Sequence, residues 1–215
     1  MKILSLLLTF CLFTFIVNAQ RGKVELSHYI FPEFTKGTVL MKSGTVNPTS
    51  LNYNALTEEM IFNSNGKNLA MTRLEEIDTV YIEKRKFFLV NNKFVELLYR
   101  NKYDLYIAHK CSVVEPGKPA AYGGTSQTSS TTSYSSILSG GQAYELSLPE
   151  GYTTKPYFEY WLKKDGKLTL IINMRQLAKQ FDDKSDQFKK FVKENKVKYD
   201  DQEGILSLVK FMEGQ

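Results

Sequence analysis

Two turn sequences constrain the fold of this chain most strongly, because each follows a short run rich in β-branched and aromatic residues. Asn65-Gly66 follows the run at 60–62, and Asp165-Gly166 follows the run at 157–162. Asn, Asp and Gly tolerate the positive φ angles that a two-residue hairpin turn demands, so each pair predicts a β-hairpin. The chain is therefore expected to consist mainly of antiparallel strands.

Similar runs recur roughly every ten residues between Gly37 and Pro116, which is the pattern of an antiparallel meander. Val, Ile, Tyr and Phe dominate these runs, as a half-buried pleated surface prefers. We expect a meander sheet that is either curved and open or closed into a partial barrel. The predicted strands include 60–62, 69–71, 79–82, 87–90, 94–99, 105–113, 157–162 and 168–171.

After residue 172 the apolar period changes from two to about 3.6, which predicts three short helices. The expected N-caps are Asn173 for the first helix and Asp183 or Ser185 for the second, and Asp200 and Glu203 bracket the expected start of the third. The apolar stripe of the third helix consists of Ile205, Leu208, Val209 and Met212. Helices this short are unstable alone in water, so we expect them to pack on the sheet. The expected fold class is β-rich α+β with a small C-terminal helical cap.

The first nineteen residues have the composition of an export signal. Lys2 is followed by an apolar run at 3–17, and the small residue Ala19 ends a site suited to signal-peptidase cleavage. The run is shorter than the ~20 residues that span a bilayer, so no transmembrane anchor is expected. We predict an exported protein that is periplasmic, displayed at the cell surface or secreted. The expected parts are a signal peptide at 1–19, a β-rich domain at 20–172 and a helical cap at 173–215.

Residues 117–141 interrupt the sheet pattern with Gly, Ser and Thr and show no periodicity. Such a segment is either a mobile loop or a functional flap, and we interpret it as a mobile loop. The candidate ligand-binding aromatic residues are Tyr122 and Tyr134 in this loop, and Tyr157 and Trp161 in the hairpin that follows. Exposed aromatic rings on a sheet beside a loop would suit a carbohydrate, a peptide or a lipid.

Charge and cysteine content argue against several function classes. The 28 basic and 23 acidic residues are mixed along the chain, so no basic face for nucleic acid is indicated. Cys11 lies in the export signal, which leaves Cys111 without a partner for an intramolecular disulfide. With two histidines and no cysteine cluster, no zinc or copper site is expected. No cofactor motif is present in the sequence, so we expect no cofactor.

His109 and Cys111 are the catalytic candidates of this sequence. In a strand, residues two apart project from the same face, so the imidazole and the thiol would lie side by side. A thiol beside an imidazole is the beginning of a cysteine nucleophile. The same face is otherwise apolar at Leu105, Ile107 and Val113, and a lone buried Cys behaves as a small hydrophobe. We therefore interpret the pair as core packing.

Several segments taken together resemble a group of exported proteins of unknown function from the Bacteroidota. These segments lie at 37–40, 51–54, 59–62, 78–82 and 188–211. The resemblance covers most of the chain after the export signal and implies an envelope location, but it implies no activity and no catalytic residue. Asp78-Thr79-Val80 is similar to the O-glycosylation sequon of these bacteria, which implies Thr79 as an acceptor.

We expect a non-catalytic exported binding or interaction module of the bacterial envelope. Its partner would be an envelope protein, a glycan or a hydrophobic ligand. One alternative is a periplasmic carrier of a lipid or another hydrophobic molecule, which would need a large internal apolar pocket. A second is a hydrolase whose residues are scattered in the sequence. A pocket that unites His109 and Cys111 with a carboxylate or an amide would favour that alternative.

Overall fold

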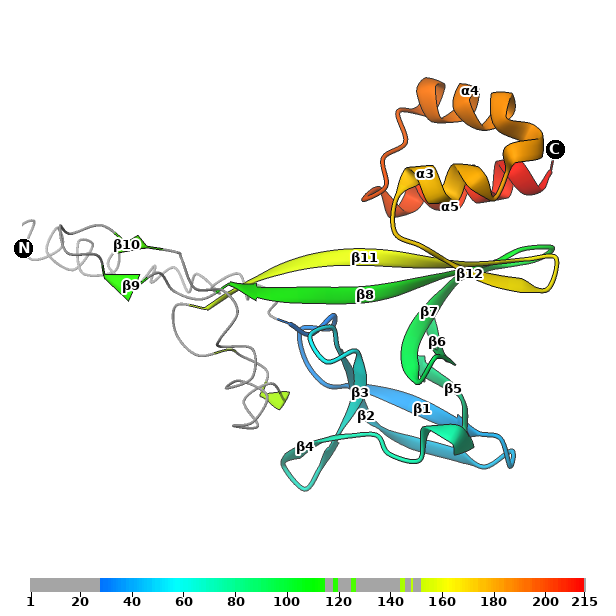
Figure 1. Ribbon diagram of the computed structural model, residues 1–215. Helices are drawn as coiled ribbons and strands as arrows, with labels where there is room; N and C mark the ends of the chain where they lie inside the picture. The colour runs from blue at the N-terminus through cyan, green and yellow to red at the C-terminus, as the bar shows by residue number, and fades with distance from the viewer. Residues whose placement is uncertain are drawn as a thin grey trace, which may run out of the picture.

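The computed structural model describes residues 28–114 and 152–214, together with residues 118–119, 125–126, 144, 145 and 148. Ten strands of this part form one antiparallel sheet, and three α-helices follow it (Figure 1). The sheet strands are β1 (Thr35–Met41), β2 (Val46–Asn54), β3 (Glu59–Ser64), β4 (Lys67–Ala70), β5 (Ile77–Ile82), β6 (Arg85–Val90), β7 (Lys93–Arg100), β8 (Asp104–Val114), β11 (Thr153–Lys164) and β12 (Lys167–Ile171). The helices are α3 (Met174–Lys179), α4 (Ser185–Asn195) and α5 (Gln202–Glu213), and the 3-10 turns are η1 (Leu74–Glu76) and η3 (Asp182–Lys184).

The predicted hairpin turns are confirmed by the backbone. Asn65 and Gly66 both have positive φ angles, 51° and 80°, and so do Asp165 and Gly166, at 51° and 78°. Each pair joins two antiparallel strands, β3 to β4 and β11 to β12. A short separate ladder pairs β9 (Lys118–Pro119) with β10 (Thr125–Ser126) inside the predicted loop 117–141, whose other residues lie outside the described part of the chain.

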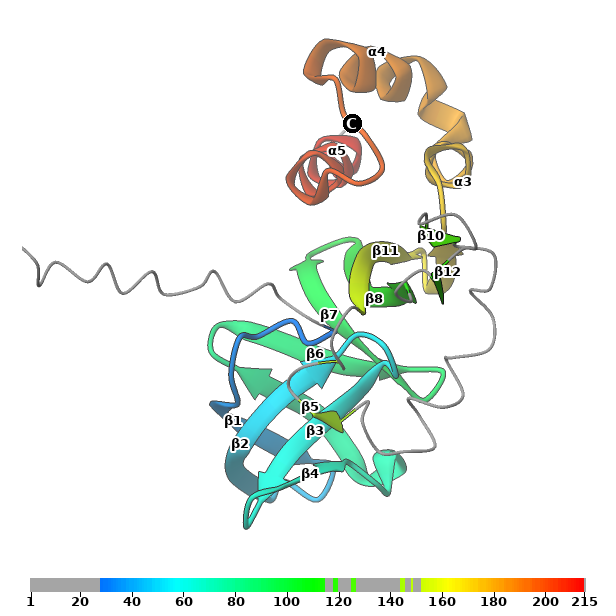
Figure 2. The same cartoon turned by 90° about the vertical axis from the view of Figure 1, so that its left-hand side faces the viewer.

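The sheet is curved and remains open. Its strand order is β12-β11-β8-β7-β6-β5-β1-β2-β3-β4, so β12 and β4 are the edge strands. Strands β1 to β7 curl until β3 contacts β7 (Figure 2). At Gly37 in β1 the neighbouring strand comes so close that an added Cβ would lie 2.6 Å from the backbone oxygen of Tyr81. The predicted β-rich α+β class with a curved sheet is therefore confirmed.

The starts of α3 and α5 agree with the predictions from the sequence. The Asn173 side chain accepts a hydrogen bond from the Gln176 backbone N–H at the start of α3, as predicted. Helix α5 begins at Gln202, between Asp200 and Glu203, and its cap is Asp201, which accepts from the Gly204 N–H. At the start of α4 the N-cap residue is Lys184 rather than the predicted Asp183 or Ser185, and among the described residues no side-chain hydrogen bond caps this helix. No helix in the described residues is long and apolar enough to cross a membrane.

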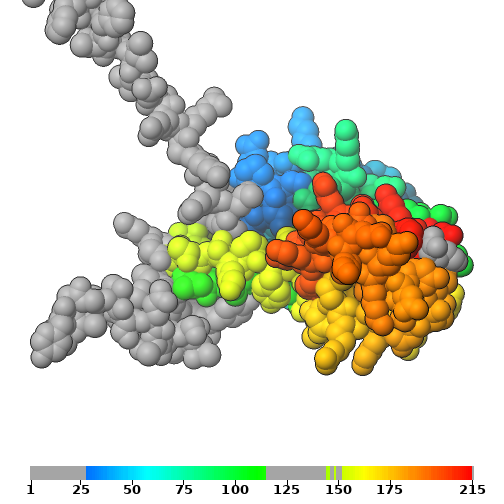
Figure 3. Space-filling model, turned by 90° about the horizontal axis from the view of Figure 1, so that it is seen from above, coloured from blue at the N-terminus to red at the C-terminus, as the bar shows by residue number. Residues whose placement is uncertain are grey.

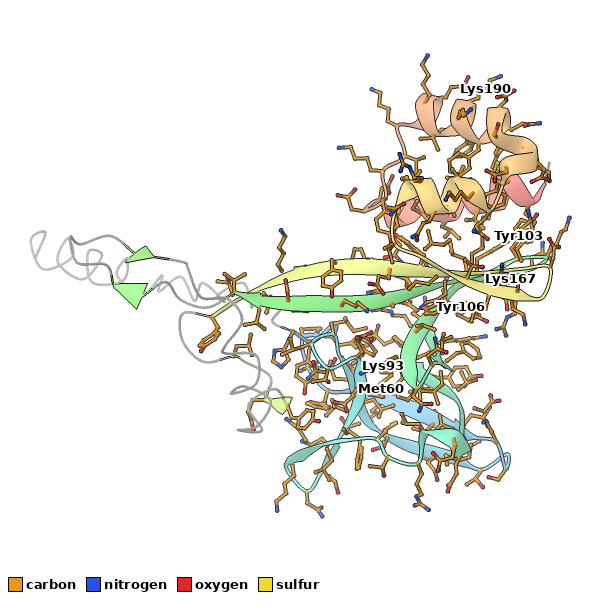
Figure 4. All side chains as sticks on the ribbon, viewed as in Figure 1. Met60, Lys93, Tyr103, Tyr106, Lys167 and Lys190 are labelled. Carbon is orange, nitrogen blue, oxygen red and sulfur yellow. The ribbon has the colours of Figure 1, made fainter. Side chains whose placement is uncertain are left out.

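A shared apolar core joins the helices to the sheet, and the helices cover only part of β11 (Figure 3). The sheet contributes Leu105, Ile107, Tyr160 and Leu162, and the helical region contributes Leu177, Phe181, Phe188, Ile205, Leu208, Val209 and Met212. Each large side chain buried in this way contributes about 1.5–3 kcal/mol. A second core fills the curl of β1 to β7; Met60 lies in it, whereas Tyr103 lies beneath the helices (Figure 4).

Polar contacts also fix the helices to the sheet. The Glu213 carboxylate, at the end of α5, accepts hydrogen bonds from the Tyr99 hydroxyl at 2.5 Å and the Tyr103 backbone N–H at 2.6 Å. The Tyr199 hydroxyl, just before α5, donates to the Ile171 carbonyl at 2.8 Å. These contacts tie the helices to β7, to the β7–β8 turn and to β12, so the helical region packs as an integral part of the fold.

Gly37→Ala is expected to lower the free energy of unfolding by about 1–3 kcal/mol, because the added methyl group would overlap the backbone of β5. Urea denaturation monitored by circular dichroism measures this difference. Lys36→Ala, at the exposed neighbouring position, is the matched control and should change the midpoint little. An unchanged midpoint for Gly37→Ala would contradict the close approach of β1 and β5.

Candidate functional site

Strands β7 and β8 each carry one polar side chain on the face that packs into the two apolar cores. On β7 this residue is Glu96, and on β8 it is His109. Ile107, on one side of His109, belongs to the core beneath the helices. Cys111, on the other side, belongs with Phe94 to the core of the curled strands. The two polar residues therefore lie at the boundary between the two apolar cores.

Glu96, Arg85 and His109 form a compact ionic cluster. Arg85 Nε donates to Glu96 Oε1 at 2.8 Å, and Arg85 Nη2 donates to Glu96 Oε2 at 2.5 Å, which makes a bidentate pair. His109 Nε2 lies 2.6 Å from the same Oε2 and 2.9 Å from Arg85 Nη2. Because a carboxylate can only accept hydrogen bonds, we assign the Nε2 proton of His109 to the bond with Glu96.

Two aromatic rings hold the Arg85 side chain at the start of β6. Its guanidinium carbon lies 5.0 Å from the ring centre of Phe31 and 5.4 Å from that of Phe87, both within cation–π range. Phe31 is fixed by the buried Asn52, whose Oδ1 accepts from the Phe31 N–H and whose Nδ2 donates to the Phe31 carbonyl. The segment before β1 thus helps to position the guanidinium.

The cluster determines the charge state of Glu96. Burial alone would raise the pKa of this carboxyl, but the hydrogen bonds from His109 and Arg85 outweigh burial and hold the pKa below its ordinary value of 4.5. Glu96 is therefore a carboxylate at neutral pH. Apolar residues often replace a buried ion pair without loss of stability, so stability alone gives little reason for this cluster.

A pocket of about 450 Å³ opens beside the cluster, within the size range of small-molecule sites. Arg85, Glu96 and His109 form its polar wall, and Lys110 also contributes to the lining. Its apolar wall consists of Ile30, Ala55, Cys111, Pro156 and Phe158. Gln202, at the start of α5, also lines it, so the segment before β1, the sheet and the helical region all contribute. Arg85 Nη1 makes no hydrogen bond within the described residues, which leaves this donor for a ligand.

His109 and Cys111 project from the same face of β8, as the alternation predicts, and both line the pocket. The pocket thus unites them with a carboxylate, which is the condition that would favour a hydrolase. The thiol, however, is not activated, because burial raises its pKa to about 11. Its Sγ donates to the Ser112 carbonyl at 3.4 Å, and within the described residues no hydrogen bond joins it to His109.

The other predicted site residues lie away from this pocket. Trp161 and Tyr157 lie on the opposite face of β11, where Tyr157 is 46% exposed. Tyr122 and Tyr134 lie outside the described residues. Thr79 is buried in β5, and its hydroxyl donates to the Asp78 carboxylate at 2.7 Å. Glycosylation of Thr79 remains a prediction and would require modification before the strand is buried.

Glu96 and Arg85 are site residues that were not predicted from the sequence. Glu96 stands in an apolar run and shares its strand face with Phe94 and Leu98. The alternation of side chains along a strand therefore predicts that the Glu96 carboxylate faces the apolar core. That reading would have predicted a buried cationic partner. Nothing local identifies Arg85 as this partner, because it lies eleven residues away, across a strand turn.

Among the described residues, no group of three or more His, Cys, Asp and Glu side chains could hold a metal ion. Comparison of the chain with protein-family models, with curated proteins and with solved structures found no match.

Glu96→Gln is expected to lower the free energy of unfolding at neutral pH by about 3 kcal/mol, because Arg85 and His109 lose the anion that they surround. Folding lowers the pKa of this carboxyl, so its contribution to stability is complete above the pKa of the unfolded state. The contribution is lost as pH falls through the pKa of the folded state. The difference between wild type and variant should therefore shrink below pH 4.5 in urea denaturation. Glu194→Gln, exposed on α4, is the control, and a difference that does not depend on pH would contradict the ionic cluster.

Cys111 is expected to react slowly with iodoacetamide at neutral pH and to gain reactivity only as pH approaches about 11, because burial disfavours the thiolate. Labelling rates of the folded protein, measured by mass spectrometry across pH, test this. The urea-unfolded protein is the control and should react near the ordinary thiol pKa. Fast labelling of the folded protein at neutral pH would restore the nucleophile interpretation.

Proposed function

We propose that this protein is a non-catalytic exported binding module of the bacterial envelope, and that the pocket beside Arg85, Glu96 and His109 is its ligand site. The ligand is a small molecule with an apolar body and a hydrogen-bond acceptor, which meets Arg85 Nη1. The observation that carries this proposal is a fixed ionic cluster on the wall of an otherwise largely apolar pocket.

Energetics support a binding role for the cluster. Burying Glu96 and His109 at the boundary of two apolar cores, with Arg85 partly buried beside them, costs desolvation energy that apolar substitutions would avoid. In return, the cluster presents a guanidinium held by a bidentate carboxylate and two aromatic rings. A donor held in this way loses little freedom when a ligand binds, and this favours affinity and orientation.

The dimensions of the pocket favour a small ligand over a lipid. A volume of about 450 Å³ and a lining with the polar cluster at one wall suit a compact molecule with one polar end. A carrier of long acyl chains would need a larger and more uniformly apolar cavity. The raised thiol pKa of Cys111 likewise favours binding over hydrolysis.

Native mass spectrometry of the protein purified from its own envelope, before and after organic extraction, tests this function. We expect a co-purifying small molecule that extraction removes. Ile30→Trp, which fills the pocket from its apolar wall, should lose the adduct. Leu69→Trp, at an exposed site on β4, is the matched control and should keep it.

Two outcomes would contradict the proposal. One is a wild-type protein that carries no adduct before extraction. The other is an adduct that persists unchanged in Ile30→Trp, since the ligand would then occupy another place. An adduct with the mass of a phospholipid would instead favour the carrier alternative.

A further inference from the structure

A second cavity lies on the opposite face of the sheet, over β7, β8, β11 and β12. It has a volume of about 270 Å³. Val90, Val95 and Ala108 are buried apolar residues that line it, and the half-buried indole of Trp161 packs beside them. The indole is held by its neighbours in the sheet, because Trp161 pairs with Tyr106 on β8 and with Leu170 on β12. The cavity thus combines an apolar floor with one aromatic wall. We use the term outer groove for this cavity together with Tyr157, which lies farther along the same face of β11.

Charged side chains surround this floor and neutralise one another. Lys110 Nζ lies 2.9 Å from Glu159 Oε2 and 3.5 Å from Glu58 Oε2. Lys93 Nζ donates to the Thr57 carbonyl at 2.8 Å, and its charge balances the second carboxylate. The four charged groups sum to zero, so the groove offers no attraction for a strongly charged partner.

The same groups are well placed to form hydrogen bonds with the hydroxyl groups of a ligand. The carboxylates of Glu58 and Glu159 each use Oε2 for Lys110, and within the described residues their Oε1 atoms make no hydrogen bond. Each can therefore accept a hydrogen bond, while Lys110 and Lys93 supply donors and Asn91 supplies an amide. A ligand whose groups both donate and accept hydrogen bonds, and which has an apolar face for the indole, matches this lining.

We propose that the outer groove binds a neutral oligosaccharide, with the C–H face of one sugar ring stacked on Trp161 and its hydroxyls bonded to Glu58, Glu159 and Lys110. Sugars combine an apolar ring face with many hydroxyls, which is the chemistry that this lining would recognise. Tyr157 lies on the same face of β11 four residues away, about 13 Å along the strand, and is 46% exposed. It provides a second ring for a more distant sugar unit, so the ligand is an oligosaccharide rather than a single sugar.

This site is distinct from the pocket of the proposed function. The outer groove and the inner pocket lie on opposite faces of β8 and β11, so that Ala108 faces the groove and His109 faces the pocket, but Lys110 contributes to the lining of both. Trp161 lines only the groove and Ile30 lines only the pocket, so a variant at either of these positions need not disturb the other site.

Trp161 is the one tryptophan of the chain, so its fluorescence reports the outer groove directly. We would titrate the protein with cellohexaose, maltohexaose and chitotetraose as neutral probes, and with hexagalacturonate as an anionic probe. The expected result is a saturable change in Trp161 emission with at least one neutral probe and a weaker response to hexagalacturonate. Isothermal titration calorimetry would then give the affinity of that probe for each variant.

Trp161→Leu should weaken binding of that probe about ten-fold or more, because it removes the stacking surface. Glu159→Gln keeps the shape of the side chain but removes its charge, so it should weaken binding of the probe less. Tyr81→Leu on β5 and the pocket variant Ile30→Trp should leave binding of the probe unchanged. No saturable response to any neutral probe, an equal response to hexagalacturonate, or full binding by Trp161→Leu would overturn the proposal. Self-association in ultracentrifugation that Trp161→Leu abolishes would assign the face to a second copy of the chain and also overturn it.

Discussion

The ionic cluster around Glu96 is the constraint on which the candidate site depends. A carboxylate buried at the boundary of two apolar cores is tolerable only with a cation in bonding geometry, and Arg85 supplies two hydrogen bonds to it. Arg85 is itself held between Phe31 and Phe87, so the segment before β1 must lie against the sheet. His109 completes the cluster from β8. The fold of the first seven strands and the polarity of the pocket are thus linked through one carboxylate.

The twist of the long strands explains why a pocket forms at this boundary. One face of β8 packs under the helices at Ile107 and inside the curled strands at Cys111, because a twisted strand turns the same face toward different neighbours along its length. His109 lies between the two cores, and its ring centre is 6.3 Å from that of Tyr53 on one side and 5.5 Å from that of Phe158 on the other. The opposite face of the same strands carries the outer groove around Trp161. The sheet therefore presents two chemically different surfaces, an inner one with a fixed donor and an outer one with balanced charges.

Sequence alone predicted what is decided locally. Asn65-Gly66 and Asp165-Gly166 specify their turns through backbone conformation, and the stripe from Ile205 to Met212 specifies a buried helix face. Asp200 and Glu203 bracket the start of α5 as predicted, but the sequence does not show which of the two adjacent aspartates caps the helix. The site was only half predictable: alternation placed His109 beside Cys111, but its partnership with Arg85 depends on strand pairing that no local pattern reveals.

Titration of the Glu96 side-chain carboxyl by carbon-13 NMR would show whether Arg85 and His109 hold it as a carboxylate. We expect a pKa below 4.5, with the His109 ring resonances responding in the same pH range, because His109 donates to this carboxylate. A Glu96 pKa above 4.5 would contradict it. That result would mean that burial dominates, that the carboxyl lacks its cationic partner in solution, and that the pocket wall is not the fixed donor on which the proposed binding depends.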